Sequence, residues 1–124
     1  MVLVDTSVWI RFLANRAPYA QELDKLLAFD EVAGHELVFG ELLIGDRGGR
    51  RDLLEAYKQI YWASCVPDNE VVEFVRARSV HGRGMGWIDV QLLASAMVGR
   101  LPLWTADASL SATAAELGVG YTMG

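Results

Sequence analysis

The chain has 124 residues, a length at which one hydrophobic core is usual, so we expect a single domain spanning residues 1–124. A composition of 52% hydrophobic and 22% charged residues excludes an intrinsically disordered protein, and the net charge of −5 excludes a broadly basic surface for long nucleic acids. The apolar runs are too short to cross a bilayer, and the first residues lack a secretory signal pattern. We therefore expect a cytoplasmic protein without membrane spans, and the single cysteine, Cys65, agrees with a reducing compartment.

Short apolar runs alternate with segments of helical periodicity along the chain. Strands that alternate with helices predict a mainly parallel sheet covered by helices on both faces, with ligands bound beyond the carboxyl ends of the strands. In chain order the pattern predicts a strand at 2–4, helices at 8–13 and 18–30, a strand near 31–33, helices at 35–44 and 50–61, a strand at 62–66, a helix capped by Asp68 or Asn69, a loop at 79–87, a helix at 88–98, a strand at 101–105, a helix at 108–117 and a last strand at 119–122.

Four acidic residues stand at informative places in this pattern. Asp5 and Asp107 follow strands, Asp89 opens a helix, and Glu41 lies within the most apolar helix. One interpretation is local: the three aspartates cap their helices or complement the positive helix ends. Glu41 has apolar neighbours on most sides, so we expect it to be buried, where it needs a salt bridge with an arginine or a bound cation.

Taken together, the four acids predict one shared site at the carboxyl edge of the sheet. Carboxylates crowded into one cleft repel each other, and a divalent cation such as Mg²⁺ or Mn²⁺ neutralises them. Such an ion acidifies a bound water and neutralises charge on a phosphoryl group during in-line attack. The pattern therefore favours metal-assisted phosphodiester chemistry.

Four segments, in order and with their spacing, resemble those of the PIN-domain family: Val4-Asp5-Thr6-Ser7, then residues 40–45, 87–94 and 104–107. The resemblance covers essentially the whole chain and is closest to the VapC toxins. It implies a three-layer α/β/α PIN-like fold with a mainly parallel, four- to five-stranded central sheet. It also implies a Mg²⁺-dependent endoribonuclease, with Mn²⁺ as an alternative ion, that acts as the toxin of a type II toxin–antitoxin system. Hydrolysis of RNA by a metal-activated water is then expected to leave a 3′-hydroxyl and a 5′-phosphate.

The resemblance also assigns roles to residues. It implies that the catalytic metal ligands are Asp5, Glu41, Asp89 and Asp107, with Thr6, Ser7 and Thr105 as supporting polar neighbours. Many members of the family carry His where this chain has Gln91, and the segment 108–110 lacks an aromatic residue often found there. Neither departure replaces a carboxylate, so both bear on substrate choice.

Partners follow from the same resemblance. Members of the family form homodimers and are silenced by VapB-type antitoxins that pack over hydrophobic grooves. Candidate contact residues here are Trp9, Phe12 and Trp62, with a role in the core as the alternative. The arginine fork suits phosphate, so the candidate RNA contacts are Arg47, Arg50, Arg51 and Arg83, with a solvated helix face as the alternative.

Three other functions compete with this interpretation. A response-regulator receiver needs a lysine after a late strand, but Lys25 and Lys58 both come early. A haloacid-dehalogenase-type phosphatase needs a second aspartate where Ser7 stands. A PIN-like domain that binds RNA or protein without cutting it stays open, although the presence of all four acids disfavours it.

Overall fold

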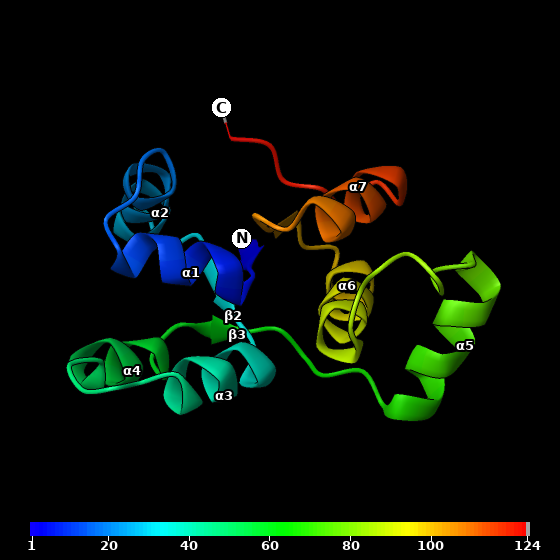
Figure 1. Ribbon diagram of the computed structural model, residues 1–124, viewed down its shortest axis with the longest axis horizontal. Coiled ribbons are helices and arrows are strands. Elements are labelled where there is room, and N and C mark those ends of the chain that lie inside the picture. The colour runs from blue at the N-terminus through cyan, green and yellow to red at the C-terminus, as the bar shows by residue number, and fades with distance from the viewer. Residues whose placement is uncertain (124) are drawn as a thin grey trace.

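The structure is a computed structural model that describes residues 1–123, and its elements are labelled in Figure 1. In chain order they are β1 (Val2–Val4), α1 (Thr6–Leu13), α2 (Tyr19–Ala28), β2 (Val32–Gly34), α3 (Glu36–Ile44), α4 (Arg51–Tyr57), β3 (Tyr61–Trp62), α5 (Asp68–Arg78), α6 (Trp87–Gly99), β4 (Leu103–Trp104) and α7 (Ala108–Glu116).

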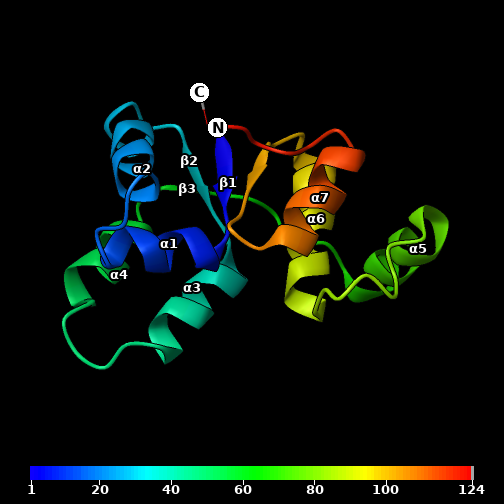
Figure 2. The same cartoon turned by 45° about the horizontal axis from the view of Figure 1, so that its top comes forward.

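The strands form one parallel sheet in the order β3-β2-β1-β4. Val2 pairs with Val32, and Leu3 lies between Ala33 on one side and Leu103 on the other. Helices α1, α2 and α4 cover one face of the sheet, and α6 and α7 cover the other (Figure 2). The predicted three-layer fold is confirmed with four strands, while the predicted last strand contributes only a bridge between Leu103 and Gly120.

The buried core explains why these short strands hold together. Leu3, Val4 and Val8 are fully buried, as are Leu92 and Leu93 of α6, so β1 is enclosed on both faces. Such continuous apolar strands are typical of parallel sheets. Between residues 1 and 123 no helix is long and apolar enough to cross a lipid bilayer.

The middle of the chain differs from the sequence prediction. The helix expected at 50–61 ends at Tyr57, and the strand expected at 62–66 is limited to Tyr61–Trp62. The rest of that segment is held by a side chain: the Gln91 amide accepts from Val66 N at 3.0 Å and donates to Val66 O at 2.8 Å. This pair satisfies the backbone groups that a longer strand would have paired.

The starts of the helices also differ in part. Pro67 holds the N-cap position of α5, so the prediction of Asp68 or Asn69 as its cap is wrong. Helix α3 begins after His35, whose Nδ1 accepts a hydrogen bond from Leu37 N at 3.1 Å. A fully buried histidine therefore takes the capping role that Ser, Thr, Asp or Asn usually plays.

Candidate active site

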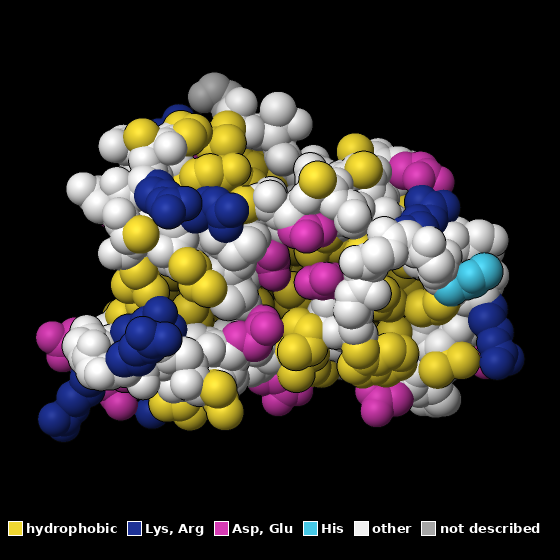
Figure 3. All heavy atoms as spheres, viewed as in Figure 1, with side chains coloured by type: hydrophobic (Ala, Val, Ile, Leu, Met, Phe, Trp, Pro, Cys, Tyr) yellow, Lys and Arg dark blue, Asp and Glu magenta, His cyan; other side chains and the backbone are white. Residues whose placement is uncertain are grey.

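The four acids predicted from the sequence lie at the carboxyl edge of the sheet. Asp5 directly follows β1 and Asp107 comes three residues after the end of β4, while Asp89 sits in the first turn of α6 and Glu41 in α3. In Figure 3 acidic side chains gather around a hollow in the middle of the face formed by α1, α3, α6 and α7. The topology thus brings together residues that lie up to about a hundred positions apart in the sequence.

Asp5 does not cap the helix that follows it. Its backbone is extended at the N-cap position of α1, yet its side chain makes no capping hydrogen bond. Instead Oδ2 accepts from Ser7 Oγ at 2.7 Å and from Thr105 Oγ1 at 2.8 Å. The carboxylate is 5% exposed, and within residues 1–123 its other oxygen has no hydrogen-bond donor. The capping interpretation is therefore wrong for Asp5, and one oxygen is free for a ligand.

Ser7 and Thr105 join the turn after β1 to the turn after β4. Ser7 Oγ accepts from Ala106 N at 2.9 Å, and Thr105 Oγ1 accepts from Asp107 N at 3.0 Å. The two hydroxyls are 3.2 Å apart, and both also contact Asp5. These small side chains fix the position of the Asp5 carboxylate, because each hydroxyl that donates to it is itself held by a backbone group.

Glu41 is exposed, so the prediction that it is buried is wrong. Helix α3 is apolar all round, but only Val38 and Leu42 are buried, and Ile44 is 87% exposed. Glu41 Oε1 accepts from Thr6 Oγ1 at 2.7 Å, and no arginine pairs with it among the described residues. Thr6 directly follows Asp5, so this hydrogen bond ties α3 to the turn that carries the buried carboxylate.

Asp89 and Asp107 each combine a capping bond with a free oxygen. Asp107 Oδ1 accepts from Leu110 N at 2.8 Å, which caps α7. Asp89 Oδ2 accepts from Gly86 N at 3.2 Å at the start of α6. The local interpretation is correct for both residues, but in residues 1–123 the second oxygen of each carboxylate has no donor. The capping bonds therefore orient these carboxylates and leave one oxygen of each for another ligand.

The electrostatics of the site indicate an uncompensated negative charge. Burial raises the pKa of Asp89, and the neighbouring charges of Asp5 and Asp107 raise it further, against the lowering effect of its bond from Gly86. Across residues 1–123 the ion pairs join Lys25 to Glu22, Lys58 to Glu55 and Arg83 to Glu116, so none reaches the four acids. A cleft with this charge favours a cation.

The carboxylate oxygens of the site are suitable ligands for a hard divalent ion that keeps part of its hydration shell. In residues 1–123 no three acidic, histidine or cysteine side chains are grouped closely enough to enclose an ion directly. Mg²⁺ needs no such cage, since it usually retains several waters and is held by one or two carboxylates. The residues that would hold it are Asp5, Asp89 and Asp107, with Glu41 at the rim.

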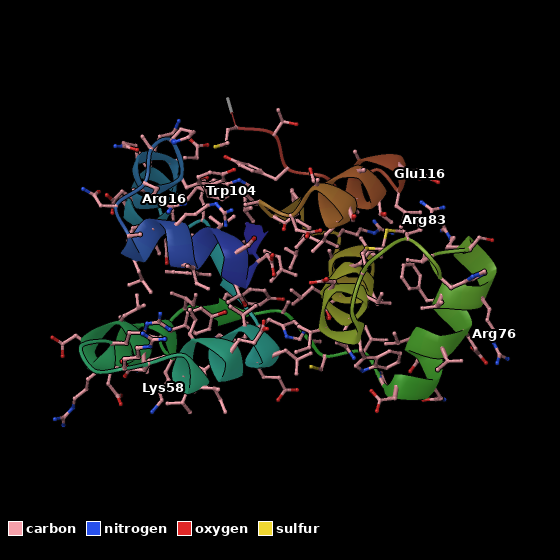
Figure 4. All side chains as sticks on the ribbon, in the orientation of Figure 1. Arg16, Lys58, Arg76, Arg83, Trp104 and Glu116 are labelled. Atoms are coloured by element: carbon pink, nitrogen blue, oxygen red, sulfur yellow. The ribbon has the colours of Figure 1, made fainter. Side chains whose placement is uncertain are left out.

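The arginines proposed to contact RNA fall into two groups. Arg50 Nη1 donates to Leu42 O at 2.9 Å at the end of α3, and Arg83 pairs with Glu116 at 2.6 Å. The labels of Arg83 and Glu116 lie close together in Figure 4. Arg47 and Arg51 are exposed. Arg50 and Arg83 therefore have structural partners, which leaves Arg47 and Arg51 as the available pair.

Arg11, which none of the predictions from the sequence named, contacts the turn that follows Asp5. Arg11 Nη1 donates to Ser7 O at 2.9 Å from one turn further along α1. Its guanidinium also lies over the Tyr19 ring, 5.5 Å from the centroid. A helical spacing of four residues from the site serine was the available signal, because residues i and i+4 share a helix face.

Gln91 and Trp9 have structural roles. Gln91 is 3% exposed and its amide is engaged with the backbone of Val66. Trp9 is 2% exposed, so its role in the core is confirmed, although it lines an apolar hollow of about 100 Å³ together with Phe12 and Leu53. Phe12 and Trp62 are half-buried.

Comparison with known proteins identifies the family. The sequence-family model described as PIN domain matches residues 2–116 of the chain. The chain belongs to the PIN domain family. Ribonuclease VapC32 of Mycobacterium tuberculosis, in two strains, is 44% identical over 120 residues, which cover 96% of this chain and 94% of the relative. The resemblance to VapC ribonucleases read from the four motifs is thereby confirmed.

Two solved structures share the fold of this PIN domain. PAE2754 from Pyrobaculum aerophilum superposes with a TM-score of 0.59 at 20% identity, covering 90% of this chain and 84% of that one. FitAcB from Neisseria gonorrhoeae gives a TM-score of 0.61 at 23% identity, covering 89% of this chain and 90% of that one. At these identities the likeness concerns the architecture alone.

Proposed function

We propose that this PIN domain is a Mg²⁺-dependent endoribonuclease, with Mn²⁺ as an alternative ion, in which Asp5, Glu41, Asp89 and Asp107 form the catalytic site. The observation that carries the proposal is the Asp5 carboxylate, which is buried beside two further acids without a basic partner in residues 1–123. A similarity of 44% identity to a protein named as a ribonuclease supports RNA as the substrate.

The protein side chains position the reacting groups. Ser7 and Thr105 hold Asp5 through charge-assisted hydrogen bonds to one carboxylate oxygen, which leaves the other oxygen for a ligand. Capping bonds orient Asp89 and Asp107, and Thr6 holds Glu41 at the outer edge. When bound here, Mg²⁺ would acidify a water and offset the charge of the phosphodiester. Hydrolysis then leaves a 3′-hydroxyl and a 5′-phosphate.

RNA cleavage by the purified chain tests this function. We expect cleavage with Mg²⁺ and none with EDTA, and we expect Asp5→Asn to abolish it, because the amide cannot supply a charged ligand. Asp24→Asn is the matched control, since Asp24 is an exposed aspartate of α2. Equal activity of the two variants would contradict the assignment of Asp5. Binding of RNA without cleavage by the unmutated chain would instead favour the non-catalytic PIN-like module.

We also propose that the chain is a toxin with a VapB-type antitoxin as its partner, and that it forms a homodimer. The apolar hollow lined by Trp9, Phe12 and Leu53 can bind apolar side chains of an antitoxin helix. Co-expression with its cognate VapB-type antitoxin should relieve growth arrest and yield a complex on gel filtration. Scattering-based mass measurement of the chain alone tests the dimer, and a monomer mass would contradict it.

A further inference from the structure

A second hollow is lined by Asp107, one of the four acids. Its volume is about 370 Å³, and it is lined by Thr105 and Asp107 of the acidic site as well as by residues of α2, α7 and the C-terminal segment. The segment after α7 runs back toward α2 above the sheet, as Figures 1 and 2 show. A group bound in this hollow therefore contacts Asp107 and lies beside Thr105, whose hydroxyl donates to Asp5.

Three aromatic rings line the hollow. Trp104 is 2% exposed, and Tyr19 is stacked on it with ring centroids 6.1 Å apart and an angle of 21°. Tyr121 lies 5.3 Å from Trp104 by centroids at an angle of 50°. Figure 4 places Trp104 between α2 and the C-terminal segment. Trp104 is covered by its neighbours, so the half-buried rings of Tyr19 and Tyr121 are the ones that offer apolar surface to a flat ligand.

The C-terminal segment is fixed in place over the hollow. The Tyr121 hydroxyl donates to Glu22 of α2, and Tyr121 N donates to Leu103 O at 2.9 Å. Val119 O accepts from Leu103 N at 2.6 Å. These bonds connect the segment to both β4 and α2, so the wall of the hollow is formed before any ligand binds. A preformed wall lowers the entropy cost of binding.

Arg11 lies between the acids and this aromatic cluster. One N–H bonds to Ser7 O at 2.9 Å, and the guanidinium covers Tyr19 at 5.5 Å. In residues 1–123 Arg11 forms no ion pair, so its remaining N–H groups are available to an anion. Figure 3 shows basic side chains over α1 and α2 beside the central acidic group. A cation beside aromatic rings matches the two parts of a nucleotide, because arginine binds phosphate and aromatic rings stack on bases.

We propose that this hollow is a nucleotide subsite of the RNA-cleaving site. It receives one unpaired base next to the bond that is cut, while Arg11 binds a phosphate of the same strand. The exposed hydroxyls of Ser111 and Thr122 at its rim can bond the edge of the base. Bases stacked within a duplex cannot enter, so the substrate is single-stranded RNA or an unpaired loop. The subsite rests on the proposed ribonuclease function.

Filling the hollow tests the proposal, with a matched control on the same helix. Ser111 and Ala112 are neighbouring exposed residues of α7, and of these two only Ser111 lines the hollow. We compare Ser111→Leu with Ala112→Leu, measuring the binding of a fluorescein-labelled single-stranded oligoribonucleotide in EDTA by polarisation. Loss of one stacked base predicts that Ser111→Leu weakens Kd about tenfold or more, while Ala112→Leu stays within about twofold. Thr122→Leu, on the opposite rim, is the second variant if Ser111→Leu does not fold.

An abasic position in the RNA identifies the group that enters. A single abasic site is moved along the oligonucleotide. At one position it should weaken binding to the unmutated chain and to Ala112→Leu. It should not weaken binding to Ser111→Leu any further, because the abasic site and Ser111→Leu remove the same contact. A blunt RNA duplex should bind more weakly than the single strand. Additive effects of the abasic site and Ser111→Leu, or equal binding by the two leucine variants, would overturn the subsite.

Cleavage with Mg²⁺ separates the two proposals. If the unmutated chain cuts RNA, Ser111→Leu should raise KM and alter the base found beside the cut, as read from sequenced 5′ ends, while Ala112→Leu should do neither. If the chain does not cut RNA but Ser111→Leu still loses binding, the ribonuclease proposal fails, and with it the link of the hollow to a cleavage site, while the binding of a base in the hollow is supported. If it cuts RNA and both variants behave alike, the subsite alone fails.

Discussion

Replacing Thr105 by valine removes the hydroxyl that joins β4 to the buried carboxylate, and its cost can be worked out from the contacts. Thr105 Oγ1 donates to Asp5 Oδ2 at 2.8 Å and accepts from Asp107 N at 3.0 Å. A hydrogen bond to a charged group contributes about 1.5–3 kcal/mol, and a neutral one about 0.5–1.5 kcal/mol. Ser7 still donates to Asp5, and water can reach the exposed Asp107, so we expect a loss of about 2–4 kcal/mol in the free energy of unfolding.

Thr113→Val is the matched control for this substitution. Thr113 is 3% exposed in α7, and within residues 1–123 its hydroxyl bonds only the carbonyl of Ser109, at 3.0 Å, which is a bond within its own helix. Valine there should cost less than about 1 kcal/mol, since a back-bonded hydroxyl adds little to helix stability. Urea unfolding in EDTA, followed by circular dichroism, compares the two variants at unchanged m-value. If Thr105→Val is no more destabilising than Thr113→Val, the proposed anchoring of Asp5 is refuted.

Two further substitutions test features that the structure added. Burial lowers the pKa of His35 from 6.5 in the folded chain. As the pH falls, His35 is therefore protonated in the unfolded chain before it is protonated in the folded one. The contribution of His35 to the free energy of unfolding is complete above pH 6.5 and decreases below it. His35→Asn, which retains a capping side chain, should flatten this decrease in urea melts between about pH 7 and 5. Arg50→Ala should lower the free energy of unfolding by about 0.5–1.5 kcal/mol because Leu42 O loses its donor. Arg47→Ala, at an exposed position, should be neutral, and equal urea midpoints for the two would contradict the capping role of Arg50.

The sequence predicted those features that depend on local periodicity and on the chemistry of single residue types. The run Val2-Leu3-Val4 followed by Asp5 predicts a buried strand with an acid at its end, and the structure has that arrangement. The alternation of strands and helices predicts the parallel sheet, and the carboxyl ends of parallel strands meet at one edge. The convergence of Asp5 and Asp107 could therefore be inferred without coordinates.

Other features depend on tertiary contacts that a linear pattern does not contain. An apolar helix predicts burial on all sides, but α3 leaves Ile44 and Leu43 exposed, so the inference that Glu41 is buried was wrong. Hydrophobicity in a sequence records how apolar a surface is and not whether it is covered. The use of Gln91 to hold the segment near Val66 was equally hidden, because it joins residues 25 positions apart through a side-chain amide.

The caps show how local rules are overridden. Asp5 has the residue type and position of an N-cap, yet its carboxylate turns to Ser7 and Thr105. His35 lacks the usual residue type but caps α3, since its other ring nitrogen lies 3.0 Å from Ser95 Oγ within the core. In both cases a partner supplied by a distant element decides the side-chain direction, and the propensity of the residue alone does not.

A Mg²⁺ titration followed by thermal melting tests the central claim most directly, because it needs no knowledge of the RNA substrate. A ligand that binds only the folded state raises the melting temperature. We predict that Mg²⁺ raises the midpoint of the unmutated chain and of Asp24→Asn, and that it raises the midpoint of Asp5→Asn much less. Without metal, the relief from removing one of several neighbouring negative charges is offset by the two charge-assisted hydrogen bonds that Asp5 loses, so we expect the metal-free midpoint to change little. Equal Mg²⁺-dependent shifts in all three proteins would contradict a shared metal site built on Asp5.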